Sequence, residues 1–143
     1  MVGAIVALCA AVALSGCAAH SALHVSLTAT PDCNSCGKDK GYPLTYRVLQ
    51  VTDASVVTGM SLAQLWNKES ALLGPALLDK QEFFVDPGQT KDLPVAKKPG
   101  AAAIIVVGNF CRPRGTCWYF AQRLAAGGSV KLVAGPDCLK TAK

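Results

Sequence analysis

The chain has 143 residues and a formal net charge of +5; 51% of its residues are apolar and 16% are charged. This length is enough for one compact domain and too short for two. The basic residues form short, separated pairs such as Lys97–Lys98 rather than the contiguous stripe of a nucleic-acid-binding protein. We therefore expect no nucleic-acid partner.

The first segment has the pattern of a secretory signal peptide that ends at a cysteine. From Val2 to Leu14 it is apolar and uncharged for roughly 13 residues, whereas a membrane-spanning helix needs about 20. The sequence Leu14-Ser15-Gly16-Cys17 closes this segment and resembles the bacterial lipobox. In a lipobox the cysteine is acylated and becomes the first residue of the mature protein.

We expect processing to divide the chain into a signal peptide at 1–16, a lipidated tether at 17–22 and a folded domain at 23–143. Several acyl chains on Cys17 would hold the mature protein on a membrane, because each buried methylene contributes about 0.8 kcal/mol. Ala18 follows the cysteine in place of aspartate. By analogy with enterobacterial sorting, this favours the outer membrane. Apart from this N-terminal lipid we expect no cofactor.

Seven cysteines in so short a chain indicate an oxidising compartment. Cys9 is lost with the signal peptide and Cys17 carries the lipid, so at most two intramolecular disulfides can form. The remaining five are Cys33, Cys36, Cys111, Cys117 and Cys138. A bridge between Cys111 and Cys117 would join two neighbouring strands across a hairpin loop and contribute about 2–3 kcal/mol. Cys138 could instead pin the C-terminal tail to Cys33 or Cys36, and the spacing does not choose among these pairings.

Alternation of apolar and polar residues predicts a half-buried strand at Leu23–Ala29. Thr30–Pro43 has no periodicity and is rich in proline, glycine, asparagine and charged residues, which is typical of a loop. A second strand is expected at Leu44–Val51, followed by a connection at Thr52–Gly59.

A helix is expected next, because Ser61 and Gln64 have the spacing of a capping box. Apolar residues recur at helical spacing up to Gly74-Pro75, which ends the helix, and Glu69 is the exception on the apolar face. A second, short helical turn is expected at Ala76–Asp79.

The remainder of the chain has the pattern of strands separated by tight turns. The apolar run Ile104–Val107 predicts a central strand buried on both faces, and Asp86–Gln89 fits a type II turn. Strands are expected at 81–85, 90–95, 101–110, 118–124 and 130–134. Seven strands with close turns and one inserted helix predict an all-β protein, a two-sheet β-sandwich.

Cys33 and Cys36 form the one motif with catalytic potential, because Cys-x-x-Cys is the spacing of thiol–disulfide oxidoreductases. The following residues, Gly37–Pro43, include two glycines and a proline, so they do not supply the helix start that lowers the pKa of such a thiol. Zinc binding is disfavoured because Cys111 and Cys117 are six residues apart and no histidine lies near either pair. We expect no metal site and no enzymatic activity.

Several short motifs resemble the TssJ (SciN/VasD) lipoproteins of the type VI secretion system membrane complex. Besides the lipobox, the matching segments are Tyr46–Val51, Met60–Trp66, Leu73–Leu78 with Ala76 in place of an aspartate, Glu82-Phe83 with Pro87–Gln89, and Gly108–Phe110 with Arg112 and Trp118. The resemblance implies a transthyretin-like β-sandwich with a short inserted helical segment. It also implies a lipid anchor in the outer membrane, with the domain facing the periplasm.

The resemblance further implies a non-catalytic member of a larger hetero-oligomeric complex. Proteins of this family bind the periplasmic C-terminal domain of a TssM-like inner-membrane protein, largely through the loop between their first two strands. That loop corresponds here to Thr30–Pro43. Its candidate contact residues are Asp32, Cys33, Asn34, Ser35, Cys36, Gly37, Lys38, Asp39 and Lys40. The two cysteines in this loop depart from the family pattern.

Two other functions stay open at this point. A periplasmic small-ligand carrier on the same sandwich would need a sizeable apolar cavity, for which the few aromatic residues offer little lining. A thiol–disulfide protein would use Cys33 and Cys36.

Overall fold

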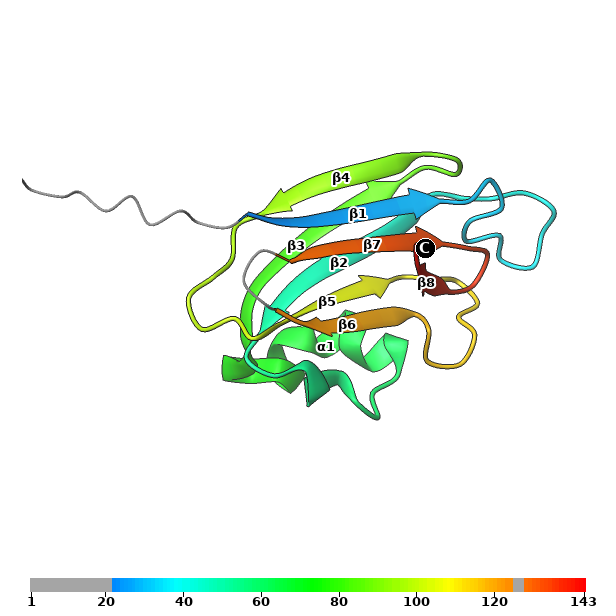
Figure 1. The fold of residues 1–143 in the computed structure, drawn as a ribbon. Coiled ribbons are helices and arrows are strands. Elements are labelled where there is room, and N and C mark those ends of the chain that lie inside the picture. Colours follow the sequence, from blue (N-terminus) through cyan, green and yellow to red (C-terminus); the bar gives the residue numbers. More distant parts are fainter. Residues whose placement is uncertain (1–21, 125–127) are drawn as a thin grey trace, which may run out of the picture.

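The computed structural model describes residues 22–124 and 128–143. The expected signal peptide, the lipobox and most of the tether lie outside the described residues. Gly127, which with Gly128 is expected to form the turn before the last predicted strand, also lies outside them. Two four-stranded sheets pack face to face, with one helix outside them (Figure 1). The strands are β1 (Leu23–Ala29), β2 (Leu44–Val51), β3 (Leu77–Val85), β4 (Thr90–Val95), β5 (Ala103–Gly108), β6 (Tyr119–Arg123), β7 (Ser129–Ala134) and β8 (Leu139–Thr141). The helices are α1 (Leu62–Leu73) and two short 3-10 turns, η1 (Ala54–Val57) and η2 (Gly74–Ala76). The expected all-β sandwich with an inserted helix is confirmed.

The strand order is β4-β1-β7-β8 in one sheet and β3-β2-β5-β6 in the other. All pairs of neighbouring strands are antiparallel except β1 and β7, which run parallel. β1 therefore lies inside its sheet, with β4 on one side and β7 on the other.

The core lies between the sheets and extends under α1. All six residues of β5 are buried, which explains its uninterrupted apolar sequence: one face meets the opposite sheet and the other is covered from the α1 side (Figure 1). Leu65 and Leu73 of α1 are buried and belong to the part of the core that extends under the helix. The helix begins as expected, since the Ser61 side chain accepts from the Gln64 backbone and the Gln64 side chain accepts from the Ser61 backbone.

The strands differ from those expected in two places. The helical turn expected at Ala76–Asp79 is a strand from Leu77 onward, because β3 pairs with β2 as far as Leu77 opposite Val51. This pairing with a neighbouring strand outweighs the local helical preference of a leucine-rich segment. The strand β8 was not expected, because three residues are too few to show a period of two; it exists by pairing with β7.

Within the described residues, no helix is both long enough and apolar enough to cross a membrane.

Candidate partner-binding site

Three loops meet at the end of the sandwich where β1 finishes (Figure 1). They are the β1–β2 loop at 30–43, the β5–β6 loop at 109–118 and the β7–β8 loop at 135–138. We call these three loops the tip. The parallel pairing of β1 with β7 and the antiparallel pairing of β2 with β5 bring the loops to the same end. The predicted contact loop thus belongs to a composite surface.

Two disulfides cross-link the three loops. Cys36 in the first loop bonds to Cys111 in the second, with 5.5 Å between their Cα atoms. Cys117 in the second loop bonds to Cys138 in the third, with 5.1 Å between Cα atoms. The pairing of Cys111 with Cys117, one of those left open by the sequence, is therefore not formed. Both residues lie outside the paired segments of β5 and β6, so each faces an adjacent loop rather than the other. Cys138 likewise bonds to neither Cys33 nor Cys36.

Asn34 holds the same three loops together through hydrogen bonds. Its side-chain amide donates to the Pro43 carbonyl at 3.1 Å, and its side-chain oxygen accepts from the Cys111 backbone amide at 3.0 Å. Its own backbone amide donates to the Gly135 carbonyl at 3.1 Å. Asn34 is buried and has a φ of 50°, a conformation that asparagine tolerates better than most residues. Sequence reasoning placed Asn34 in the loop but gave no signal for this structural role.

The first loop folds back tightly on itself. The Tyr42 backbone amide donates to the Cys33 carbonyl at 2.8 Å, which brings the two arms of the loop together. Gly41 lies at this crossing, where a Cβ atom would collide with the Pro31 carbonyl oxygen. Glycine is therefore required at this position by close backbone approach.

The nine predicted contact residues divide into two groups. Cys33 and Asn34 are buried and Ser35 and Cys36 are half-buried, so these four shape the loop. The exposed residues are Asp32, Gly37, Lys38, Asp39 and Lys40. The Nζ atoms of both lysines lie near the Tyr42 ring, at 5.6 and 5.1 Å from its centroid, within the range of cation–π attraction.

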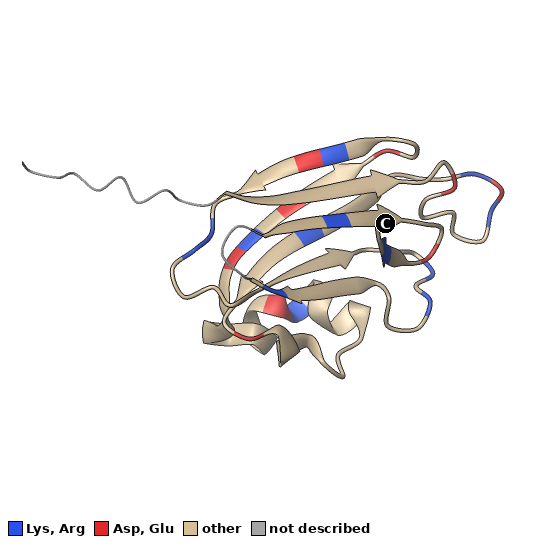
Figure 2. Cartoon of the chain, viewed as in Figure 1, with Lys and Arg blue, Asp and Glu red and all other residues tan. Residues whose placement is uncertain are grey.

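The other two loops add charged groups that sequence reasoning did not place at the site. Arg112 and Arg114 are exposed, and the Arg114 Nε atom lies 3.6 Å from a carboxylate oxygen of Asp137. A groove of about 450 Å³ runs between the first and third loops, and its lining includes Asp32, Arg114, Asp137 and Lys140. Basic side chains outnumber acidic ones at this end of the molecule (Figure 2).

Cys33 does not have the chemistry of a redox centre. Its side chain is fully buried, and burial, with a smaller effect of the Asp32 charge, raises the pKa of the thiol to about 11. A reactive thiol needs the opposite shift, since the thiolate is the nucleophile. Cys36 is bonded to Cys111, so the interpretation of Cys33 and Cys36 as a Cys-x-x-Cys pair is wrong.

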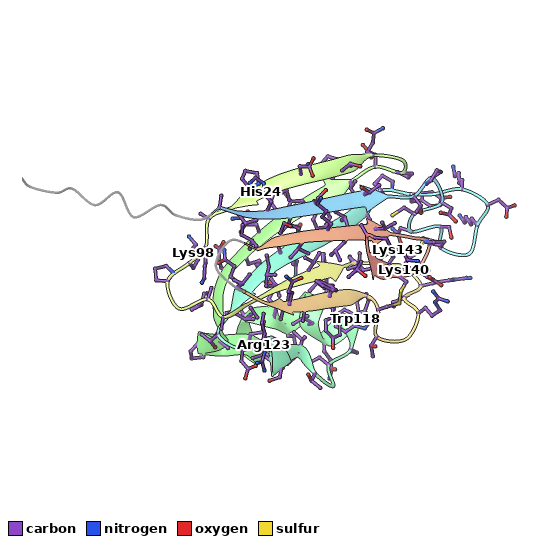
Figure 3. The ribbon with its side chains drawn as sticks, in the orientation of Figure 1. His24, Lys98, Trp118, Arg123, Lys140 and Lys143 are labelled. Carbon is purple, nitrogen blue, oxygen red and sulfur yellow. A yellow bond between two sulfur atoms is a disulfide. The ribbon has the colours of Figure 1, made fainter. Side chains whose placement is uncertain are left out.

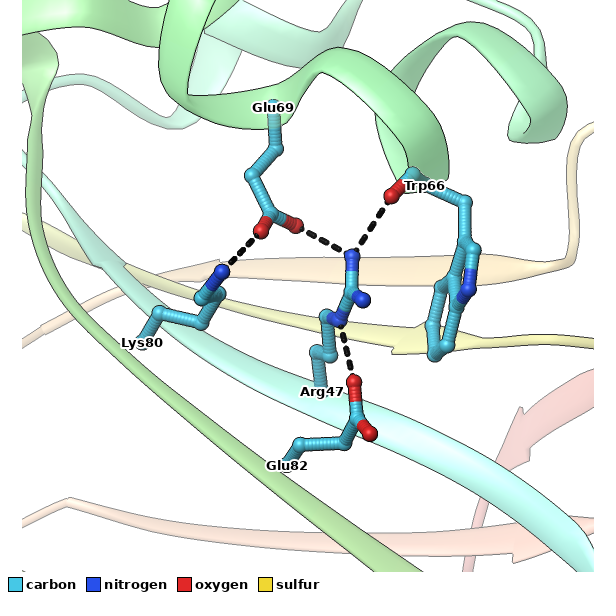
Figure 4. Close-up of polar contacts among 5 residues, drawn as sticks. All are labelled: Arg47, Trp66, Glu69, Lys80 and Glu82. Atoms are coloured by element: carbon cyan, nitrogen blue, oxygen red, sulfur yellow. Dashed lines mark hydrogen bonds and ion pairs between the residues drawn. The ribbon is translucent and has the colours of Figure 1, made fainter.

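A second polar cluster lies between the outer face of β2 and α1 (Figure 4). The Arg47 guanidinium donates to Glu69 and to the Trp66 carbonyl at 2.7 Å each, and to Glu82 at 2.7 Å. Lys80 makes a second ion pair with Glu69 at 2.5 Å. The Arg47 guanidinium carbon also lies 3.8 Å from the centroid of the Trp66 ring. We call these five residues the Arg47 cluster.

The Arg47 cluster explains the charged residue on the apolar face of α1. Glu69 is 6% exposed, and a carboxylate so buried is stable only with partners. Arg47 and Lys80 supply the opposite charges, so the cluster fixes how α1 sits on the sheet.

Among the described residues, no group of three or more histidine, cysteine or carboxylate side chains is placed to hold a metal ion.

The amino-acid sequence matches a family model over residues 21–133, which is well over half of the chain. That family is described as type VI secretion lipoproteins and includes VasD, EvfM and TssJ. A search of curated protein sequences gave no significant match.

Solved structures with the same fold include Lip of Serratia marcescens, a membrane-bound component of the type VI secretion system. It has a TM-score of 0.78 and 24% identity, over 86% of this chain and 96% of the Lip chain. The lipoprotein TssJ1 of Pseudomonas aeruginosa has a TM-score of 0.75 and 15% identity, over 85% and 95% of the two chains. A chain in a structure described as the TssM C-terminal domain from EAEC has a TM-score of 0.71 and 14% identity, over 85% and 98%. At these identities the structural likeness shows the fold alone.

Proposed function

We propose a scaffold function from one premise: the chain belongs to the family of type VI secretion lipoproteins described as VasD, EvfM and TssJ. In this proposal the protein is a non-catalytic lipoprotein, anchored by lipid on Cys17 in the outer membrane and facing the periplasm. Its tip binds the periplasmic C-terminal domain of a TssM-like inner-membrane protein and so joins the membrane complex.

The observation that carries this proposal is the placement of the tip relative to the start of the domain. β1 begins at Leu23, next to the tether, and ends at Ala29, where the tip begins. Seven residues of strand separate these points by about 20 Å. An anchor at one end therefore leaves the tip free to meet a protein from the opposite membrane.

The construction of the tip also supports partner binding. Two disulfides and the Asn34 hydrogen bonds fix three loops before any partner arrives. A preorganised surface loses little conformational entropy on association, which favours affinity. The exposed lysines and arginines complement a partner surface that carries carboxylates.

The proposal is tested with charge reversal at exposed tip residues, Lys38→Glu with Lys40→Glu. Replacing the whole loop would not be informative, because Cys36 and Asn34 hold the tip together. We expect affinity for the TssM-like domain to fall by about tenfold or more, measured by titration calorimetry, because like charges then face each other. The matched control, Lys97→Glu with Lys98→Glu, makes the same charge change at the opposite end and is expected to bind normally. Unchanged binding by the tip variant would place recognition elsewhere.

The anchor is tested separately. Cys17→Ser removes the acceptor for the lipid, so we expect the N-terminal peptide of the variant to lack the acyl and diacylglycerol mass found in the wild type. Mass spectrometry of the purified proteins measures this difference. An unmodified Cys17 in the wild-type protein would overturn the lipoprotein assignment whatever the tip binds.

A further inference from the structure

The loop between β4 and β5, residues 96–102, lies at the end of the sandwich opposite the tip. Val95, the last residue of β4, pairs with Leu23, the first residue of β1, so this loop leaves the sheet beside the point where the tether joins the domain. Figure 3 labels Lys98 at this end, with Lys140 and Lys143 at the other. The loop therefore lies beside Leu23, the residue at which the tether joins the domain.

A buried side chain holds the backbone of this loop. Gln50 on β2 is fully buried, and its amide nitrogen donates to the Ala96 carbonyl at 2.9 Å. Its amide oxygen accepts from the Lys98 backbone amide at 2.8 Å. The Ala101 amide then donates to the Lys98 carbonyl at 3.1 Å and closes a turn. The loop presents its side chains from a fixed backbone.

Lys97 and Lys98 are both exposed on this loop. Neither takes part in an ion pair with any residue that the structure describes. Most other lysines and arginines also lack one, so the position of this pair beside the start of β1 is what distinguishes it. Two adjacent positive charges thus point into solvent without compensation. Such a site attracts a negatively charged surface.

We propose that Lys97 and Lys98 dock the domain onto the phosphates of anionic phospholipids in the membrane that holds the anchor. This inference depends on the lipidation of Cys17 in the proposed function. The five residues between Cys17 and Leu23 span at most about 20 Å, so the anchor keeps the loop close to the lipid surface. The attraction falls off over a Debye length of about 8 Å at physiological ionic strength, which makes contact at the surface necessary.

Docking at this loop sets the orientation of the domain. Each lysine near an anionic surface strengthens binding by about fivefold, so the pair tightens it by roughly 30-fold once the tether has brought it there. The tip, at the other end of β1, is then directed away from the membrane. The lipid on Cys17 alone would hold the domain at the membrane without fixing its orientation, and the lysine pair supplies that orientation.

The test uses the full lipidated protein in vesicles of phosphatidylglycerol mixed with phosphatidylcholine, and in vesicles of phosphatidylcholine alone. Lysines are modified with an amine-reactive reagent, and mass spectrometry measures the extent at each position. We expect modification of Lys97 and Lys98 to be roughly threefold or more slower on anionic vesicles, and this protection to disappear at about 0.5 M salt. Lys38 and Lys40 at the tip should react equally on both.

Two variants separate the lysine pair from general charge. Lys97→Gln should reduce the protection of Lys98, whereas Lys38→Gln with Lys40→Gln should leave it unchanged. Equal modification of Lys97 and Lys98 on both kinds of vesicle, with the lipid present on Cys17, would overturn the inference while leaving the anchor intact. Protection of Lys38 and Lys40 instead would show that the tip faces the lipid, which would overturn both the inference and the proposed partner site. A wild-type protein without lipid would overturn the anchor, and with it this inference.

Discussion

The tip and the flank, by which we mean α1 together with the Arg47 cluster, both lie at the periphery of the sandwich, but different interactions hold them in place. The tip buries Phe110 and Trp118. Its loops are also joined by two disulfides and by the hydrogen bonds of Asn34. The flank buries Leu65 and Leu73, and ion pairs to Glu69 align it. The flank is ordered by burial and ion pairs, whereas the tip, which also carries exposed polar residues, has covalent links in addition that offset part of its conformational entropy.

The largest effect is expected from removing the bridge that joins the first two tip loops, with Cys36→Ser and Cys111→Ser together. The bonded residues are 75 apart in sequence, for which the chain-entropy estimate gives a loss of about 4 kcal/mol in the free energy of unfolding. The matched double variant, Cys117→Ser with Cys138→Ser, removes a bridge between residues only 21 apart in sequence. Its free energy of unfolding should fall by about 3 kcal/mol. Urea unfolding measures both. Losses below about 1 kcal/mol would show that hydrogen bonds alone order the tip.

On the flank, Glu69→Gln should lower the free energy of unfolding by about 3 kcal/mol, because it leaves the largely buried Arg47 without the carboxylate that is buried beside it. Glu82 contacts the same guanidinium but is half-exposed, so Glu82→Gln should cost less than about 1 kcal/mol. The same unfolding assay compares them. Equal losses would mean that burial of Glu69 does not determine the strength of the Arg47 cluster.

A smaller effect is expected at the start of α1. Ser61→Ala removes one side of the capping box and should lower stability by about 1 kcal/mol. The loss should be confined to the flank, so hydrogen exchange should quicken in α1 and stay unchanged at the tip. Faster exchange in the tip as well would show that the two regions are coupled.

The smallest expected effect is the dependence of stability on pH that Cys33 contributes, and it appears only in alkali. The folded thiol has a pKa of about 11 against 9.0 for an unperturbed thiol, so its neutral form favours the folded state. That stabilisation is complete below pH 9 and is lost as the pH rises from 9 to about 11. Cys33→Ala should therefore lose less stability than the wild type between pH 8 and pH 10 in urea unfolding. An identical loss in both proteins would assign the alkaline sensitivity to another group, such as Tyr46, whose pKa burial raises to about 12.

Local patterns in the sequence predicted the elements that depend on local physics. β1 has the expected bounds because alternation over seven residues specifies a half-buried strand. The bounds of β2 and β4 also match those expected. The capping box at Ser61 was predicted because all of its atoms lie within four residues. The family resemblance, carried by short motifs along the chain, predicted the sandwich.

The sequence did not predict features that depend on contacts between distant residues. The bridge from Cys36 to Cys111 and the pairing of Glu69 with Arg47 require the three-dimensional positions of loops and helix. Spacing alone left the partner of Cys111 open, and the structure shows that adjacent loops, rather than adjacent residues, determine the pairing. Asn34 gave no signal because its partners come from three separate loops.

The position of β1 inside its sheet has a mechanical consequence. A pull between the tether and the tip acts along this strand, which is hydrogen-bonded to β4 from Leu23 to Thr28 and to β7 from His24 to Ala29. Where the pull reaches the tip through a loop of another strand, the force passes out of β1 through hydrogen bonds that lie across its direction, so they share the load in shear instead of opening one at a time. An edge strand in the same place would bear force through one set of bonds, and β1 bears it through two.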